Sequence, residues 1–331
     1  MDSTDLYNLK QHFFLGMAHS HDRTLPFFTR LLPQGAYKSL VEQKLPQQSS
    51  EDYIPILFYK ARAHIALGDT QAVASLIPTD TENFALKAVT VFAKYISAPA
   101  GDAALEELRD LCIEIEGDDV EATEREKGWV RVVAGTAFAR AGEIEEALET
   151  LGAESTTENL EAVAIAVQIY LSIHRPDLAR KEFERAKPWA EDDLLLQLME
   201  STIGLVTGKD GYSDSQSFYT EQLANPSLSS PHLLTARGVT RLLRGEVQEA
   251  KSDLEEAVLQ QDGHDDAETL AASVVAAGLG PKKGDADELW SRLASAYPEH
   301  PLVSTVYAKA SEFDDLVVKF RVPPLAIPTA A

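Results

Sequence analysis

The residues best suited to metal chemistry lie near the N-terminus, where one residue separates His19 from His21 and Asp22 follows. Imidazole and carboxylate groups bind zinc, and a structural zinc site usually has four ligands. The chain has a single cysteine, Cys112, and no further cluster of such ligands accompanies the histidine pair. We therefore expect a solvated loop here and no metal site.

Two other segments have the composition of ion-binding or phosphate-binding loops but not the spacing. Residues 278–284, GLGPKKG, lack the GxxxxGK[ST] spacing, and no buried strand precedes them. Residues 114–129, EIEGDDVEATEREKGW, concentrate carboxylates without the alternating ligands and central glycine of a calcium loop. We expect a loop between helices in the first case and a long solvated loop between repeats in the second.

The thiol of Cys112 lies between Leu111 and Ile113, which predicts a buried, unreactive side chain. No combination of Ser, His, Cys and acidic residues along the chain has the pattern of a nucleophilic or acid–base site. We therefore predict that the chain is not an enzyme, with no catalytic residues, no cofactor and no small-molecule substrate.

The charge balance narrows the class of partner. The chain carries 30 basic and 53 acidic residues, a formal net charge of −23. Nucleic-acid binding relies on Lys and Arg that displace counterions, and anionic lipid headgroups also attract basic residues, so both surfaces are disfavoured. The acidic surface either is simply solvated or steers a basic partner. No apolar run is long enough to insert into a membrane, and the single cysteine and the absence of a signal peptide favour the cytosol.

One pattern recurs along the chain: an apolar helix, a turn, and an amphipathic helix that opens with a small residue. We mark each copy by the small or apolar residue five places after the turn, which gives Val73, Ala104, Ala147, Ala179, Ser215, Ala250 and Ala286. The intervals between these markers are 31, 43, 32, 36, 35 and 36 residues. They scatter about the tetratricopeptide period of roughly 34 residues.

Positions inside the repeats agree with this register. With Ala147 at repeat position 20, Gly135 falls at position 8 and Phe138 at position 11, where the tetratricopeptide pattern has a small and an aromatic residue. Gly238 falls at position 8 of the Ala250 repeat. Two positions depart from the pattern: Arg241 replaces an aromatic residue, and His174 replaces the turn glycine.

The sequence therefore predicts an all-α, tetratricopeptide-like superhelix, an α-solenoid of about seven to nine helix pairs closed by a C-terminal helix. We expect the solenoid to span residues 1–321 and the proline-containing tail, residues 322–331, to be extended or disordered. Since one helix pair cannot bury its own apolar face, stacked pairs share a continuous core. First helices then line a concave groove, and second helices face solvent.

The groove positions of the first helices are the predicted partner-binding residues. They are Phe58, Arg62, Ile65, Trp129, Val132, Thr136, Arg140, Ala164, Gln168, Leu171, Thr235, Val239 and Leu242. None is Lys or Asn, so a clamp for a C-terminal carboxylate, typical of chaperone-binding tetratricopeptide domains, is disfavoured. A largely apolar lining suits a permanent protein partner, although some of these residues could instead pack repeat against repeat.

Four segments, in order along nearly the whole chain, resemble the epsilon subunit family of coatomer, the coat of COPI vesicles. They are DLYNLKQHFFLG (residues 5–16), QIYLSIHRPDLARKEFERAK (168–187), LLQLMESTIGLVTGKDGYSDSQSFYTEQL (195–223) and HPLVSTVYAKASEFDDLVVKF (300–320). The chain departs from the family pattern at residues 17–35, around Asp118 and after Val322.

The resemblance implies a non-catalytic subunit of the heptameric coat that binds the C-terminal region of the alpha subunit. It implies a role in Golgi-to-ER retrograde and intra-Golgi vesicle transport. It also implies a cytoplasmic protein that is peripheral on Golgi membranes and COPI-coated vesicles through the assembled complex. The alternative is a generic tetratricopeptide adaptor or co-chaperone that binds a peptide of another protein, against which the groove without Lys or Asn counts.

Overall fold

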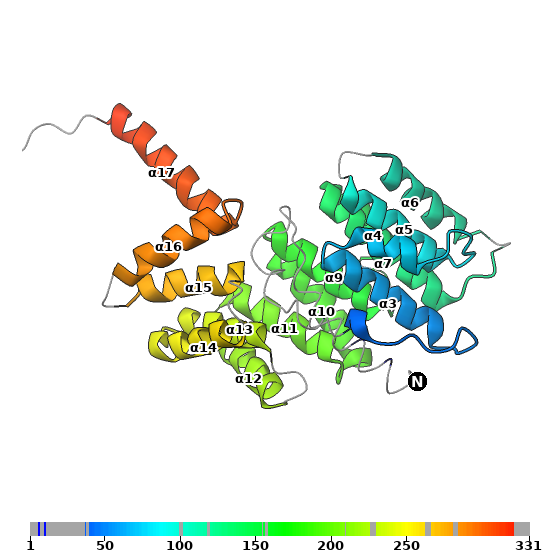
Figure 1. Cartoon of the computed structure of the whole chain (residues 1–331), viewed down its shortest axis with the longest axis horizontal. Helices are drawn as coiled ribbons and strands as arrows, with labels where there is room; N and C mark the ends of the chain where they lie inside the picture. The colour runs from blue at the N-terminus through cyan, green and yellow to red at the C-terminus, as the bar shows by residue number, and fades with distance from the viewer. Residues whose placement is uncertain are drawn as a thin grey trace, which may run out of the picture.

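The chain folds as a tetratricopeptide-like α-solenoid, in which helix pairs follow one another along the molecule (Figure 1). The computed structural model describes residues 6, 10, 37, 40–98, 102–117, 120–153, 155, 158–208, 210–225, 230–261, 266–280 and 284–320. Every helix or strand with defined bounds in this part of the chain is an α-helix. The all-α prediction is therefore confirmed.

Successive helices pack as antiparallel hairpins. The pairs are α3 (Tyr53–Ala66) with α4 (Thr70–Leu76), α5 (Phe84–Ser97) with α6 (Asp102–Glu114), α7 (Glu124–Ala141) with α8 (Ile144–Thr150), α9 (Leu160–Ser172) with α10 (Pro176–Ala190), α11 (Leu194–Thr207) with α12 (Gly211–Ala224), α13 (Pro231–Leu243) with α14 (Val247–Gln260), and α15 (Ala267–Gly278) with α16 (Gly284–Ala296). A last helix, α17 (Pro301–Lys319), follows these pairs.

The seven marker residues confirm the predicted register, because each lies in the second helix of a pair. Val73, Ala147, Ala179, Ser215 and Ala250 are fully buried there. Ala104 and Ala286 are partly exposed. The weak marker Ser215 lies in a close helix contact, where its hydroxyl donates a hydrogen bond of 2.9 Å to the carbonyl of Ser201 on the preceding helix.

Glycine at repeat position 8 lets the two helices of a pair approach each other. A Cβ atom on Gly135 would lie 2.6 Å from the Cγ of Leu151, which follows α8. A Cβ atom on Gly238 would lie 3.1 Å from the Cγ of Leu254 on α14. Since carbon atoms in contact lie about 3.5–4.0 Å apart, larger side chains at these positions would push the helices apart.

His174 occupies a turn that elsewhere uses glycine. Its φ angle is 59°, the one positive value for a non-glycine residue in the described part of the chain. The turn after α9 makes the same pair of backbone hydrogen bonds as the turn at Gly142 after α7, where φ is 85°. A left-handed residue ends both helices, so the helix-ending geometry is kept without glycine.

The predicted solvated loop over residues 114–129 is wrong in its C-terminal part. Residues 124–129 form the first turns of α7, and the hydroxyl of Thr123 caps that helix by accepting a hydrogen bond from the backbone N–H of Glu126. The carboxylate of Glu126 accepts a 2.8 Å hydrogen bond from the N–H of Phe84. The Thr-x-x-Glu spacing is a helix-start signal, and the predicted loop over residues 114–129 did not take it into account.

Three further sequence predictions concern residues 278–284, the His19–His21 pair and the C-terminal tail. α15 ends at Gly278 and α16 begins at Gly284, so the predicted position between two helices is confirmed, while residues 281–283 lie outside the described residues. The His19–His21 pair and the tail at residues 322–331 lie outside the described residues. The division into residues 1–321 and 322–331 therefore stays a prediction.

We predict that Ala250→Trp lowers the melting temperature of the protein, because a large side chain would separate α13 from α14. Overpacking of a tight core contact typically costs about 1–3 kcal/mol. Circular dichroism during heating would measure the effect. Gln248→Trp, at an exposed site on the same helix, is the control and should leave the melting temperature unchanged. Equal melting temperatures for the two variants would contradict the register.

Candidate functional site

The thirteen predicted groove residues divide into a buried group and a partly exposed group. The buried residues are Phe58, Arg62, Ile65, Trp129, Val132, Ala164, Leu171 and Thr235. The partly exposed residues are Thr136, Arg140, Gln168, Val239 and Leu242. Most of the predicted lining is thus already in contact with other parts of this chain, and whether these residues bind a partner stays a prediction.

The buried group contains a cluster of aromatic residues that joins α3 to α7. The rings of Phe58 and Trp129 stack with their centroids 4.7 Å apart and their planes 18° from parallel. Tyr59 meets Trp129 edge to face at 6.1 Å. The guanidinium of Arg125 lies over the indole of Trp129, 4.9 Å from its centroid. Each of these arrangements is favourable for aromatic rings and cations.

An ion pair extends this cluster from α3 to α9. The guanidinium of Arg62 pairs with the carboxylate of Glu161, and both side chains are at most 9% exposed. The hydroxyl of Tyr59 donates to the same carboxylate at 3.4 Å. α3 and α9 belong to pairs separated by two others, so the inner face curves tightly enough to bring them together (Figure 1).

Burial keeps the nearby tyrosines protonated. The pKa of Tyr59 is raised well above its ordinary value, mainly by burial and further by the negative charge of Glu161. The pKa of Tyr37, which is 3% exposed, is also raised by burial. A neutral hydroxyl can donate to the carboxylate of Glu161. The space between the first helices α3, α7 and α9 is therefore filled by side chains that contact one another.

Tyr59 is absent from the predicted site, and Glu161, which falls at a groove position of the Ala179 repeat, is not among the thirteen predicted residues, although both complete this cluster. A sequence signal for Glu161 existed, because it is the single charged residue in the otherwise apolar helix α9. A carboxylate in such a helix needs a cationic partner if it is buried. Its partner, Arg62, could not be identified because 99 residues separate the two along the chain (161 − 62).

We predict that Arg62→Met destabilises the protein by about 3–5 kcal/mol, because Glu161 would keep a buried charge without its cation. The double substitution Arg62→Met with Glu161→Leu should recover most of that loss, since it removes both charges. Urea denaturation of both variants and the wild type measures the two differences. Equal destabilisation by the single and the double substitution would show that the two residues are not coupled.

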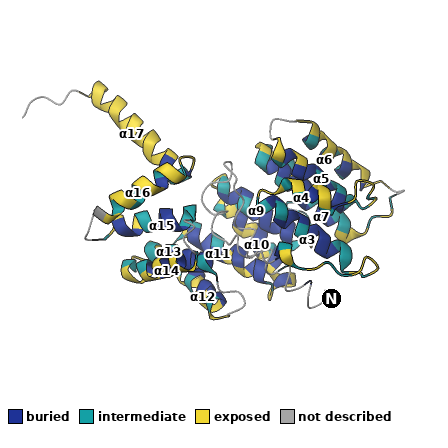
Figure 2. Ribbon diagram, in the orientation of Figure 1, coloured by how far each residue is buried: buried dark blue, intermediate teal, exposed yellow. Residues whose placement is uncertain are grey.

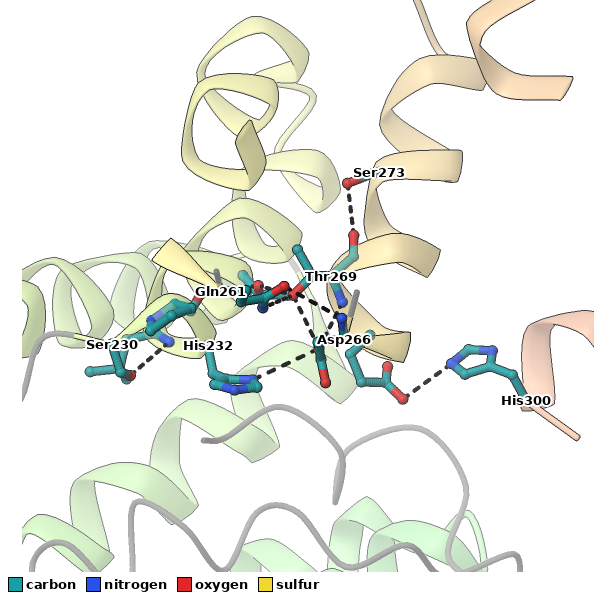
Figure 3. Close-up of polar contacts among 11 residues, drawn as sticks. Ser230, His232, Gln261, Asp266, Thr269, Ser273 and His300 are labelled. Carbon is teal, nitrogen blue, oxygen red and sulfur yellow. Dashed lines mark hydrogen bonds and ion pairs between the residues drawn. The ribbon is translucent and has the colours of Figure 1, made fainter. Parts of the chain in front are cut away.

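Thr235, a predicted groove residue on α13, is buried and meets α15 at a polar junction. Figure 3 shows this junction around Thr269 and Asp266. The hydroxyl of Thr235 lies 2.8 Å from the hydroxyl of Thr269, which also accepts a 2.9 Å hydrogen bond from the side-chain amide of Gln261. The carboxylate of Asp266 caps α15 by accepting from the N–H and the hydroxyl of Thr269, both at 3.0 Å. The junction thus holds successive repeats together through Thr235.

Two histidines flank this junction. His232 is 6% exposed, and its Nδ1 lies 3.8 Å from the carboxylate of Asp266. Burial lowers the pKa of His232 below its ordinary 6.5, and the smaller effect of Asp266 opposes this. Nε2 of His300 lies 3.1 Å from the carboxylate of Glu268, and its Nδ1 accepts from the N–H of Leu302. His300 thereby connects the start of α17 to α15.

We predict that His232 makes the protein less stable in mild acid. Below pH 6.5 the unfolded chain binds a proton at His232 that the folded chain resists, so stability falls as the pH drops from 6.5 toward the lowered folded pKa. His232→Gln, which cannot be protonated, should lose less free energy of unfolding than the wild type between about pH 7.5 and pH 5. Urea titrations at the two pH values measure this difference, and identical losses would contradict the assignment.

The C-terminal half of the inner face is less completely covered. Val239 and Leu242 of α13 pack in part against Ala272 and Ala276 of α15. The next residue, Leu243, is 42% exposed. A cavity of about 420 Å³ lies nearby among α14, α15 and α16, with walls that are mainly apolar. Exposed apolar side chains therefore occur in the half of the solenoid that lies away from the aromatic cluster.

The described part of the chain offers little for metal or redox chemistry. None of its His, Cys, Asp and Glu side chains gather in groups of three or more that could hold a metal ion. Cys112 is partly rather than fully buried, and burial raises the pKa of its thiol to about 11. The predicted unreactive thiol is consistent with this pKa. None of the described helices has both the length and the apolar character to cross a bilayer.

Comparison with known proteins places these features in a family. A tetratricopeptide repeat protein from Parabacteroides merdae has a similar fold, with a TM-score of 0.51 and 15% identity over 72% of this chain and 91% of that chain. "Coatomer subunit epsilon-1" of Arabidopsis thaliana is 28% identical over 321 residues, 95% of this chain and 97% of that relative. "Probable coatomer subunit epsilon" of Schizosaccharomyces pombe is 25% identical over 323 residues, 96% of each. The family model for the coatomer epsilon subunit matches residues 28–321. The chain belongs to the coatomer epsilon subunit family.

Proposed function

We propose that this protein is a non-catalytic structural subunit of the COPI coat, in which it binds the C-terminal region of the coatomer alpha subunit through its concave face. The observation that carries this proposal is the family match over residues 28–321, which includes every helix pair with defined bounds in the described part of the chain. The proposed role lies in Golgi-to-ER retrograde and intra-Golgi transport. The protein would then be cytoplasmic and would reach Golgi membranes and vesicles through the assembled coat.

The partly exposed residues of the inner face are the favoured contacts for the alpha subunit. In the N-terminal half, Phe58, Arg62 and Trp129 already contact other side chains of this chain. In the C-terminal half, Val239 and Leu242 keep exposed apolar surface beside Leu243. An apolar surface that a permanent partner covers is typical of obligate complexes. We therefore expect the alpha subunit to contact α13 and the helices that follow it.

The surface charge supports a protein partner. A net charge of −23 repels anionic lipid headgroups and nucleic acid alike. It also speeds association with a basic surface by long-range attraction. Attachment to membranes through other coat subunits would agree with this charge.

We predict that Leu242→Glu weakens recovery of the alpha subunit, because a charge would replace apolar contact at the inner face. The tagged full-length chain, expressed in cells depleted of the native copy, is recovered and its bound proteins are quantified by mass spectrometry. Ile113→Glu is the matched control, since Ile113 is 73% exposed on the second helix α6. Wild-type recovery of chaperones without other coatomer subunits would reject the proposed function and favour a co-chaperone.

A further inference from the structure

The last helix, α17, is almost entirely uncovered. Val303 is its one buried residue, and every residue from 304 to 320 is exposed. Figure 2 shows α17 exposed along its length, projecting from α16 beyond the rest of the described chain. The helix is held at its base, where Val303 packs against Leu270 and Leu293 and where His300 contacts Glu268. In the described part of the chain, no other helix packs against the distal turns of α17 closely enough to cover them.

The exposed apolar residues of α17 form a stripe with a defined period. Val306, Ala310, Phe313, Val317 and Phe320 recur at intervals of four, three, four and three residues. The stripe begins at the buried Val303 and so continues the contact that attaches the helix. Alternating intervals of three and four place side chains on one seam, the arrangement that receives another helix in coiled coils. The shape of the stripe therefore favours a helical occupant.

The composition of α17 also indicates that this helix is covered in the working protein. It has 19 residues, and Thr305, Val306, Val317 and Val318 are branched at Cβ, which lowers helix propensity. In proteins, most of the stability of a helix comes from packing of its apolar face and not from helix propensity. Phe313 and Phe320 are 66% and 71% exposed, and contiguous exposed apolar surface of this kind marks an interaction site.

The charges on and around α17 select among possible occupants. Lys309 pairs with Glu312 at 2.8 Å within α17, which leaves Asp314 and Asp315 against Lys319, and the whole chain carries a net charge of −23. An anionic lipid surface would be repelled by these carboxylates. A second copy of the chain is disfavoured as the occupant, because it would bring two strongly acidic chains together. A helix with a matching apolar stripe and basic residues on its flanks would instead meet Asp314 with opposite charge.

We propose that α17 is a docking helix that binds an amphipathic, basic-flanked helix of the permanent partner, in addition to the contact at the concave face. This inference rests on the proposed function, since it concerns how the same coat partner is held. The apolar seam of α17 supplies the contact surface, and Asp314, which follows Phe313 of the seam, sets the preferred charge of the bound helix.

The test compares variants on and off the seam of α17 in the full-length tagged chain, expressed in cells depleted of the native copy. Phe313→Glu combined with Val317→Glu places two charges on the seam, and recovery of the other coatomer subunits should fall by about tenfold or more. Val318→Glu is the matched control, because Val318 is 81% exposed on the same helix but lies off the seam. Its recovery should equal that of the wild type.

Two further measurements separate the remaining outcomes. All three replaced side chains are exposed, so the melting temperatures should match that of the wild type. Asp314→Lys, a surface change, should also reduce recovery, and recovery equal to that of the wild type would overturn the assignment of a basic-flanked helix. Full recovery by the seam variant would overturn the inference while leaving the proposed function intact, whereas a wild type that recovers no coatomer would overturn the proposed function itself. A dimer of the purified chain in sedimentation experiments, disrupted by Phe313→Glu, would assign the seam to a second copy and also overturn the inference.

Discussion

The close approach of the two helices within each pair is the contact on which the rest of this structure depends. Gly135 leaves no room for a Cβ atom beside Leu151, and Ala147 is fully buried in the same hairpin. The same arrangement recurs where Gly238 meets Leu254 beside Ala250. Only hairpins packed this closely present a continuous apolar flank to the next hairpin, and the shared core grows by such additions.

Stacking of these hairpins produces two regions of different character along the solenoid. Over α3 to α9, curvature brings first helices together, and the space between them is filled by the stacked rings of Phe58 and Trp129 and by the pair of Arg62 with Glu161. Toward α13 to α17, apolar side chains such as Leu243 and Phe313 are exposed. The space between the first helices is therefore more completely filled at α3 to α9 than toward α13 to α17.

Charged residues inside the solenoid act mainly as connectors between helices. Arg241 occupies a position where the repeat pattern has an aromatic residue, and it pairs with the buried Asp253 at 2.7 Å. Arg237 reaches the same carboxylate at 2.8 Å. These pairs hold α13 against α14 where a ring would otherwise fill the space. At this departure from the repeat pattern, an ion pair replaces the usual packing of an aromatic side chain, and the hairpin itself is unchanged.

The sequence alone determined the fold class, the repeat period and the register, because these depend on contacts between residues less than one repeat apart. Ala179, Ala250 and the turn at His174 are all found where the spacing predicted them. The start of α7 at Glu124 was also encoded locally, in the Thr123 cap, although the acidic composition of this segment indicated a loop. Only the tertiary structure decided that Arg62 meets Glu161, that Thr235 is buried against Thr269, and that α17 is left uncovered. These features depend on the curvature of the stack, which accumulates from a small rotation at every repeat and cannot be read from the spacing of any one of them.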